Sequence, residues 1–265
     1  MDLLHALVAH QFYVLSGFVV GILVGLTGVG GGSLMTPLLI LVFRMHPATA
    51  VGTDLLYAAA TKTAGASVHG FAKSIEWRIV GLLALGSLPA TLIVILSLAH
   101  FGAASPAASK LISLTLAIAL LISATLLFLK QRILSAATRR NPDFGLRASA
   151  GLTIATGFVV GALVALSSVG AGALGAVALA FLYPRLPTLK IVGTDVAHAV
   201  PLALLAGLGH WWLGSINFEL LFSLLVGSVP GVILGSVTAR FAPEVALRSA
   251  LAVMLAVVGL KMLTS

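Results

Sequence analysis

Asp54, Lys62 and His69 are three ionisable side chains within one otherwise apolar stretch of the 265-residue chain. On an α-helix, where each residue turns the chain by roughly 100°, they fall within one sector about 80° wide. Carboxylate, ammonium and imidazole groups can bind ions or exchange protons, and at membrane depth such groups face a cavity or one another. The stretch is therefore predicted to turn one polar stripe toward the protein interior.

A second apolar stretch carries Asp195, His198 and His210, which also share a narrow sector. The two stretches are not chemically equivalent, because Ala203 stands where the first stretch has Lys62. Buried carboxylates and histidines can change charge near neutral pH. We therefore interpret these groups as coupling or gating residues, with a proton as the coupling ion.

The two aspartates have a second interpretation. Asp54 and Asp195 each follow the dipeptide Gly-Thr near a predicted helix start, where Asp or Thr can cap free N–H groups. The preceding threonines, Thr53 and Thr194, are also candidate contacts for a substrate. Both readings of the Gly-Thr-Asp motif remain open at the level of sequence.

The segment TGVGGGS, from Thr27 to Ser33, interrupts an apolar run with four glycines. Its flanking segments, of about 17 and 12 residues, are each marginal for crossing a hydrocarbon layer about 30 Å thick. A break at that depth is tolerated only against protein or a watery cavity. A helix restarting at Gly32 or Ser33 would present free N–H groups to an anion, and SVGAGA at 168–173 would supply a second such end.

Other small residues recur every four positions and predict close helix packing rather than ligand binding. They are Gly17, Gly21, Gly25, Gly157, Gly161 and Ala165.

The composition is that of an integral membrane protein, with 60% hydrophobic and only 8% charged residues. The net charge of +8 reflects Lys and Arg in short connections between apolar runs, so it favours membrane orientation over nucleic-acid binding. Cysteine is absent, which excludes disulfides, thiolate metal sites and thiol catalysis. The first residues, MDLLHALVAHQFYV, lack the basic start of a removable signal peptide. No metal or other cofactor is expected.

The chain contains two copies of one unit. GFVVGILVGLTGVGGGSL at residue 17 matches GFVVGALVALSSVGAGAL at residue 157, and VGTDLLYAA at residue 51 matches VGTDVAHAV at residue 192. Each copy divides into a long segment, a short one and three of spanning length. In the first copy, the first predicted segment ends at Thr27 and the others cover 33–44, 49–71, 77–99 and 107–129. In the second copy, the predicted segments cover 149–168, 172–183, 190–213, 217–240 and 244–263.

Basic residues orient these segments. If the linker is cytoplasmic and segments alternate sides, eleven Lys and Arg lie inside and only Arg44, Lys110 and Lys261 lie outside. Each copy then crosses an odd number of times, whether its first two segments are re-entrant or fully spanning, so the copies are inverted. We predict an all-α integral membrane protein of two inverted repeats, each with a broken or re-entrant glycine-hinged helix pair plus three transmembrane helices. The repeats are 1–130 and 148–265, the basic linker 131–147 is cytoplasmic, and both termini are extracytoplasmic.

The paired GxxVGxxxxxxGxGGG-like openings, the later GTD and the GS-x-P run at 86 and 227 resemble the sulfite exporter TauE/SafE family, also called the TSUP transporters. The resemblance covers residues 15 to 262. It implies a permease of the bacterial inner membrane that moves sulfite, thiosulfate, an organosulfonate or a related small sulfur-containing anion. The second copy departs from the glycine-rich form, with Ser168, Ala171 and Ala173 in place of Gly28, Gly31 and Ser33.

The favoured function is secondary transport by alternating access around a midplane anion site. Its partners are the small anion, the lipid bilayer and a coupling proton, with a homodimer left open. An anion channel is the nearest alternative, and an intramembrane hydrolase using Ser67, His69 and His210 is a distant one, because residues two apart on a helix point in different directions. The candidate substrate contacts are Thr27, Gly28, Gly30, Gly31, Gly32, Ser33, Thr53, Lys62, Ser168, Gly170, Gly172 and Thr194. The candidate coupling or gating residues are Asp54, His69, Asp195, His198 and His210.

Overall fold

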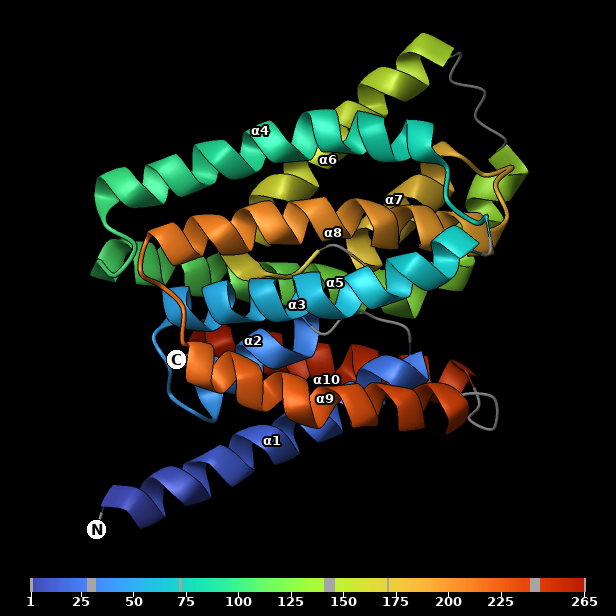
Figure 1. Cartoon of the computed structure of the whole chain (residues 1–265). Helices are drawn as coiled ribbons and strands as arrows, with labels where there is room; N and C mark the ends of the chain where they lie inside the picture. The colour runs from blue at the N-terminus through green and yellow to red at the C-terminus, as the bar shows by residue number, and fades with distance from the viewer. Residues whose placement is uncertain are drawn as a thin grey trace.

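The structure, a computed structural model, describes residues 2–27, 32–71, 73–140, 146–170, 172–238 and 244–264. Within these ranges all of the regular secondary structure is helical, with ten helices and no strand (Figure 1). The helices are α1 (Asp2–Thr27), α2 (Gly32–Leu41), α3 (Pro47–Phe71), α4 (Trp77–Phe101), α5 (Pro106–Arg140), α6 (Leu146–Ser167), α7 (Ala173–Leu182), α8 (Thr188–Trp212), α9 (Phe218–Thr238) and α10 (Glu244–Thr264).

These bounds follow the predicted segments closely, and the largest differences lie at α1 and α5. The helix α1 begins at Asp2, well before the predicted apolar segment. The helix α5 continues from the predicted span into the linker, as far as Arg140. After Pro106 the sequence contains no glycine or proline until Pro142, and the Leu, Ala, Lys, Gln and Arg in between favour helix outside the apolar part as well.

Five of the described helices are long and apolar enough to cross a membrane: Trp77–Phe101, Pro106–Leu129, Ser149–Ser167, Thr188–Trp212 and Phe218–Thr238. The helices α2 and α7 have 10 residues each. Ten residues extend about 15 Å along a helix axis, which is half of a hydrocarbon core about 30 Å thick. Each of these short helices is therefore too short to span a bilayer by itself.

The helices pack mainly in four pairs, α1 with α9, α4 with α6, α3 with α8, and α5 with α10. In Figure 1, α4 and α6 lie at the top and α1 and α9 at the bottom, with α3 and α8 between them. All four pairs therefore join a helix of the first copy to a helix of the second, so neither copy packs as a separate unit.

Glycines bring two of these pairs into backbone contact. Gly21 lies against the backbone of Ser228 on α9, and Gly161 lies against the backbone of Ser87 on α4. A Cβ atom at either glycine would overlap those backbone atoms. Gly17 and Gly25 contact α9 and Gly157 contacts α4 in the same way. The small-residue packing predicted for these five glycines is confirmed.

The central pair α3 and α8 runs antiparallel, since contacts descend along one helix as they ascend along the other. Gly52 lies beside His210, and further along α3 Gly65 lies beside Val196. The α3 and α8 helices carry all the ionisable residues of the two predicted stripes, so this pair positions the candidate site.

The threonines of the two Gly-Thr-Asp motifs cap helices of the opposite copy. Thr53 on α3 accepts a hydrogen bond of 3.1 Å from the backbone N–H of Asn217, just before α9. Thr194 on α8 accepts one of 3.0 Å from the backbone N–H of Glu76, just before α4. Each threonine therefore caps the start of a helix, and because that helix belongs to the other copy, the two hydrogen bonds join the copies. Asp54 and Asp195 lie inside α3 and α8 and do not cap their own helices.

Candidate functional site

Asp54 is held by residues from both copies of the repeat. It is the eighth residue of α3 and is fully buried. The hydroxyl of Thr36, on α2, donates a hydrogen bond to Asp54 Oδ2. The side chain of Ser168, which directly follows α6, faces the same carboxylate. Because α2, α3 and the end of α6 meet here, the carboxylate sits where the two copies join.

Asp195 occupies the corresponding place on α8 with different neighbours. Its carboxylate is buried, and Oδ1 lies directly beside Gly175 in the first turn of α7. Any side chain at residue 175 would collide with this oxygen. The absence of a Cβ at Gly175 therefore creates the room in which the carboxylate fits, close to the N-terminal end of a short helix.

Lys62 connects the two carboxylates electrostatically. Its charge interacts with Asp195 most strongly and also with Asp54. Lys62 is eight residues from Asp54, about 12 Å along the helix axis. It is one turn from Gly65, whose neighbour across the helix pair is Val196, next to Asp195. The lysine side chain retains part of its accessible surface, in contrast to both aspartates.

The two described histidines of the stripes tie α8 to its neighbours. A hydrogen bond of 2.8 Å joins His198 Nε2 to the hydroxyl of Ser87 on α4. His210 Nε2 donates a hydrogen bond of 3.0 Å to the carbonyl of Ala165 on α6. Both rings are buried. These contacts give the histidines a packing role, and a coupling role remains a prediction. The side chain of His69 lies outside the described part of the chain.

The glycine-rich breaks are only partly described. Gly28, Gly30 and Gly31 lie outside the described residues, as does the side chain of Thr27. The structure places Gly32 at the first position of α2 and buries Ser33 beside it.

The second break is described except at residue 171. The helix α6 ends at Ser167 and α7 begins at Ala173. Between them, Ser168, Gly170 and Gly172 have φ values of 58°, 129° and 134°. Positive φ is accessible to glycine and rare for other residues, which explains the glycines of this loop. A helix break is therefore present in the second copy, as the sequence predicted.

The second half of α3 has an exposed face of small and polar residues. The Thr63 hydroxyl donates to the carbonyl of Ala59, and the Ser67 hydroxyl donates to the carbonyl of Thr63. The repeat alignment pairs this face with a large, apolar face on α8. All six positions in this comparison are exposed: Thr63 with Leu204, Ser67 with Leu208, and Gly70 with Trp211.

At the end of this face lie groups that sequence reasoning did not select. Lys190, at the start of α8, forms an ion pair with Glu76, just before α4. Thr36 was missed as well, although it binds one of the predicted aspartates. The signal for Thr36 was faint: one threonine within an apolar helix, without a counterpart in the second copy, where Ala176 aligns.

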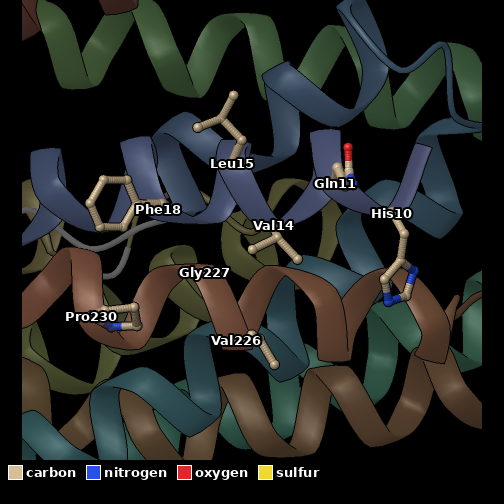
Figure 2. Close-up of a pocket in the computed structure, with 8 residues that line it drawn as sticks. All are labelled: His10, Gln11, Val14, Leu15, Phe18, Val226, Gly227 and Pro230. Carbon is tan, nitrogen blue, oxygen red and sulfur yellow. The ribbon is translucent and has the colours of Figure 1, made fainter. Parts of the chain in front are cut away.

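A groove of about 420 Å³ opens elsewhere, between α1 and α9 (Figure 2). His10 lies at one end of the groove, within 3.2 Å of the Ser223 hydroxyl and 3.5 Å from the Glu219 carboxylate. The rest of the lining is mainly apolar, and none of the predicted site residues belongs to it. The lining residues are His10, Gln11, Val14, Leu15, Phe18, Val226, Gly227 and Pro230.

Comparison with known proteins identifies the family of this chain. The family model described as "Sulfite exporter TauE/SafE" matches residues 13–262. The chain belongs to the sulfite exporter TauE/SafE family. This assignment agrees with the all-helical fold, the apolar helices and the paired motifs, and it makes the chain a member of a family of membrane transporters.

Relatives in Bacillus subtilis (strain 168) match over nearly their full length. "Probable membrane transporter protein YjnA" is 40% identical over 255 residues, covering 94% of this chain and 98% of the relative. "Probable membrane transporter protein YdhB" is 28% identical over 252 residues, covering 93% and 97%. No solved structure gives a significant match.

Proposed function

We propose that this protein is a secondary transporter that moves a small sulfur-containing anion, such as sulfite, thiosulfate or an organosulfonate, across the bacterial inner membrane. The observation that carries the proposal is Lys62, a cationic side chain inside the helix bundle that interacts with carboxylates on two helices of opposite copies. Family membership supports transport, and the lysine supports an anionic substrate.

An intramembrane lysine is costly unless it is compensated, and such residues mark substrate or ion pathways. Asp54 and Asp195 supply that compensation in the structure described. A small anion approaching the ammonium group would compete with the two carboxylates for it. Binding of the anion then changes the contacts between α3 and α8, which is a physical basis for coupling substrate binding to movement of one copy against the other.

The finer architecture that we propose is a pair of inverted repeats with a two-fold axis in the membrane plane. Reciprocal contacts support it: Thr53 reaches the start of α9 as Thr194 reaches the start of α4. Gly21 and Gly161 likewise meet aligned serines, Ser228 and Ser87. An antiparallel α3 and α8 pair with matching contacts at both ends is the arrangement expected from such an axis.

We also propose that Lys62 is reached from the cytoplasmic side in this conformation. Small polar residues at membrane depth are poorly suited to lipid, whereas the aligned Leu204, Leu208 and Trp211 of α8 suit it well. The polar face of α3 leads from Lys62 toward the loop that carries Lys73. Basic residues at that end would attract an anion.

Cysteines introduced singly into this cysteine-free chain test the proposed access and orientation together. With an impermeant, charged thiol reagent added from the cytoplasmic side, Ser67→Cys should react rapidly and Leu208→Cys slowly. Ser135→Cys and Ser265→Cys report the two sides of the membrane, the first labelled from the cytoplasm and the second from outside. Equal reaction of Ser67→Cys and Leu208→Cys would contradict the polar access face, and labelling of Ser135→Cys and Ser265→Cys from one side would contradict the topology.

Uptake into proteoliposomes tests the proposed function itself. Purified protein should accumulate labelled sulfite, thiosulfate or sulfoacetate faster than protein-free liposomes, and the unlabelled form of the preferred anion should compete. Chloride at the same ionic strength should compete poorly, because the proposed site selects a sulfur-containing anion. Uptake no faster than in protein-free liposomes for all three anions would contradict the proposal.

A further inference from the structure

We infer that Asp54 is the centre of a binding site for one sodium ion, formed by α3 and by Ser168 at the end of α6, with Thr36 of α2 fixing the carboxylate. The ion site rests on the geometry around Asp54. Its role in coupling sodium to anion transport rests in addition on the proposed function.

Two buried oxygen atoms at this position have no hydrogen-bond partner among the described residues: Asp54 Oδ1 and Ser168 Oγ. The side chains of Ser168 and Asp54 face each other. Buried polar atoms are nearly always paired, so two unpaired oxygens in one place indicate a missing partner. A cation that takes oxygen ligands satisfies both at once.

The backbone around Ser168 suits a cation as well. Ser168 follows directly after Ser167, the last residue of α6. The C-terminal end of a helix carries partial negative charge from its free carbonyl groups. In transporters with broken helices, such ends and the unwound carbonyls near them coordinate sodium ions or protons.

The charge of the surrounding cluster also calls for one positive ion. Asp54 and Asp195 bring two negative charges, and Lys62 interacts with both of them as the one cation identified among their electrostatic partners. The cluster therefore carries a net charge of −1 when all three are ionised. Uncompensated charge inside a protein is strongly unfavourable. A monovalent cation makes the cluster neutral.

The second copy does not offer an equivalent site, so we expect one sodium ion per chain. Ala176 aligns with Thr36, which removes the hydroxyl that holds the carboxylate. Gly175 packs directly against Asp195 Oδ1 and fills the space on that side. Asp195 Oδ1 is also without a hydrogen-bond partner, but no hydroxyl is identified beside it among the described residues, whereas Thr36 and Ser168 both face Asp54.

Sodium at Asp54 would also favour the anion. While the cluster is negative, it repels an incoming anion; once sodium is bound, the Lys62 ammonium is no longer outweighed by two carboxylates. Each ion then raises the affinity for the other, and this reciprocal coupling is the requirement for sodium-driven transport.

Sodium binding to the purified full chain, without any transported anion, tests the ion site. Binding of labelled sodium and the thermal unfolding midpoint should both be followed in NaCl against choline chloride at equal ionic strength. We expect saturable binding of one sodium per chain and a sodium-dependent rise in the unfolding midpoint. Ser168→Ala should weaken the sodium affinity by roughly tenfold, the effect of one lost ligand, and Asp54→Asn should abolish binding.

The matched control is Ser123→Ala. Ser123 on α5 also has a buried hydroxyl without a hydrogen-bond partner among the described residues, and it is not among the groups that act on Asp54. This variant should bind sodium like the parent. An unfolding midpoint that responds to pH but not to sodium would overturn the inference in favour of a proton at Asp54. Equal sodium binding by Ser168→Ala and the parent would overturn the site geometry.

These outcomes are separable from those of the proposed function. Sodium binding without anion uptake would leave the ion site standing and contradict the transport proposal. Anion uptake that does not depend on sodium, by a chain that binds no sodium, would support the transport proposal and overturn the ion site.

Discussion

Replacing Lys62 with methionine should reduce anion uptake into proteoliposomes by at least about 100-fold, equivalent to about 2.7 kcal/mol of lost interaction. Methionine has an unbranched apolar side chain similar to the stem of lysine but has no ammonium group and no charge. The anion would then meet Asp54 and Asp195 with no ammonium group between them. Like charges in a poorly screened interior repel strongly, so binding should fail rather than weaken slightly.

Two further variants separate the charge of Lys62 from its packing. Lys62→Arg keeps the positive charge and should retain more uptake than Lys62→Met. Lys110→Met removes an exposed lysine near the start of α5 and should leave uptake within about twofold of the parent, as expected for a distant, screened charge. Size-exclusion profiles should be alike for all variants. Normal uptake by a well-folded Lys62→Met protein would remove Lys62 from the substrate site.

Gly157→Val should abolish the recovery of folded protein from the membrane. Gly157 lies against the backbone of Leu83, and no rotamer change can make room for a side chain there. Overpacking against backbone forces α4 and α6 apart, for which we expect a cost of about 3 kcal/mol or more. The amount of monodisperse protein after detergent extraction measures the effect.

Gly151→Val is the matched control for this prediction. Gly151 lies on the same helix, α6, and a Cβ atom there would meet nothing within 4 Å. The two variants share the same change of residue and of helix propensity, so any difference between them comes from the contact with α4. Similar recovery of Gly157→Val and Gly151→Val would contradict the close packing of α4 on α6.

Much of the fold followed from periodic features of the sequence. Hydrophobic runs located the helices, because a membrane demands about 20 apolar residues per crossing. The glycines from Gly17 to Gly25 predicted a helix contact, since small residues every four positions form one flat face. The helix break near Ser168 followed from its glycines. These features are local, and local sequence is sufficient to predict them.

The partners of the site residues could not be predicted in the same way. Thr36 meets Asp54 from a neighbouring helix, and Ser168 reaches it from the other copy. Both contacts depend on how α2, α3 and the end of α6 pack together. The spacing of residues along a single helix does not predict such packing. The exposed polar face at Thr63 and Ser67 is another such case. Its significance appears only beside the apolar residues that align with it on α8.

The open question of mechanism is whether the protein carries the anion or merely conducts it, and counterflow decides between the two. Proteoliposomes loaded with the unlabelled preferred anion are placed in a trace of the labelled form at equal membrane potential. Alternating access predicts that labelled anion accumulates transiently above its equilibrium level, because the site returns loaded, and that Lys62→Met abolishes this overshoot. A monotonic approach to equilibrium, with a flux that does not saturate, would contradict alternating access and identify a channel.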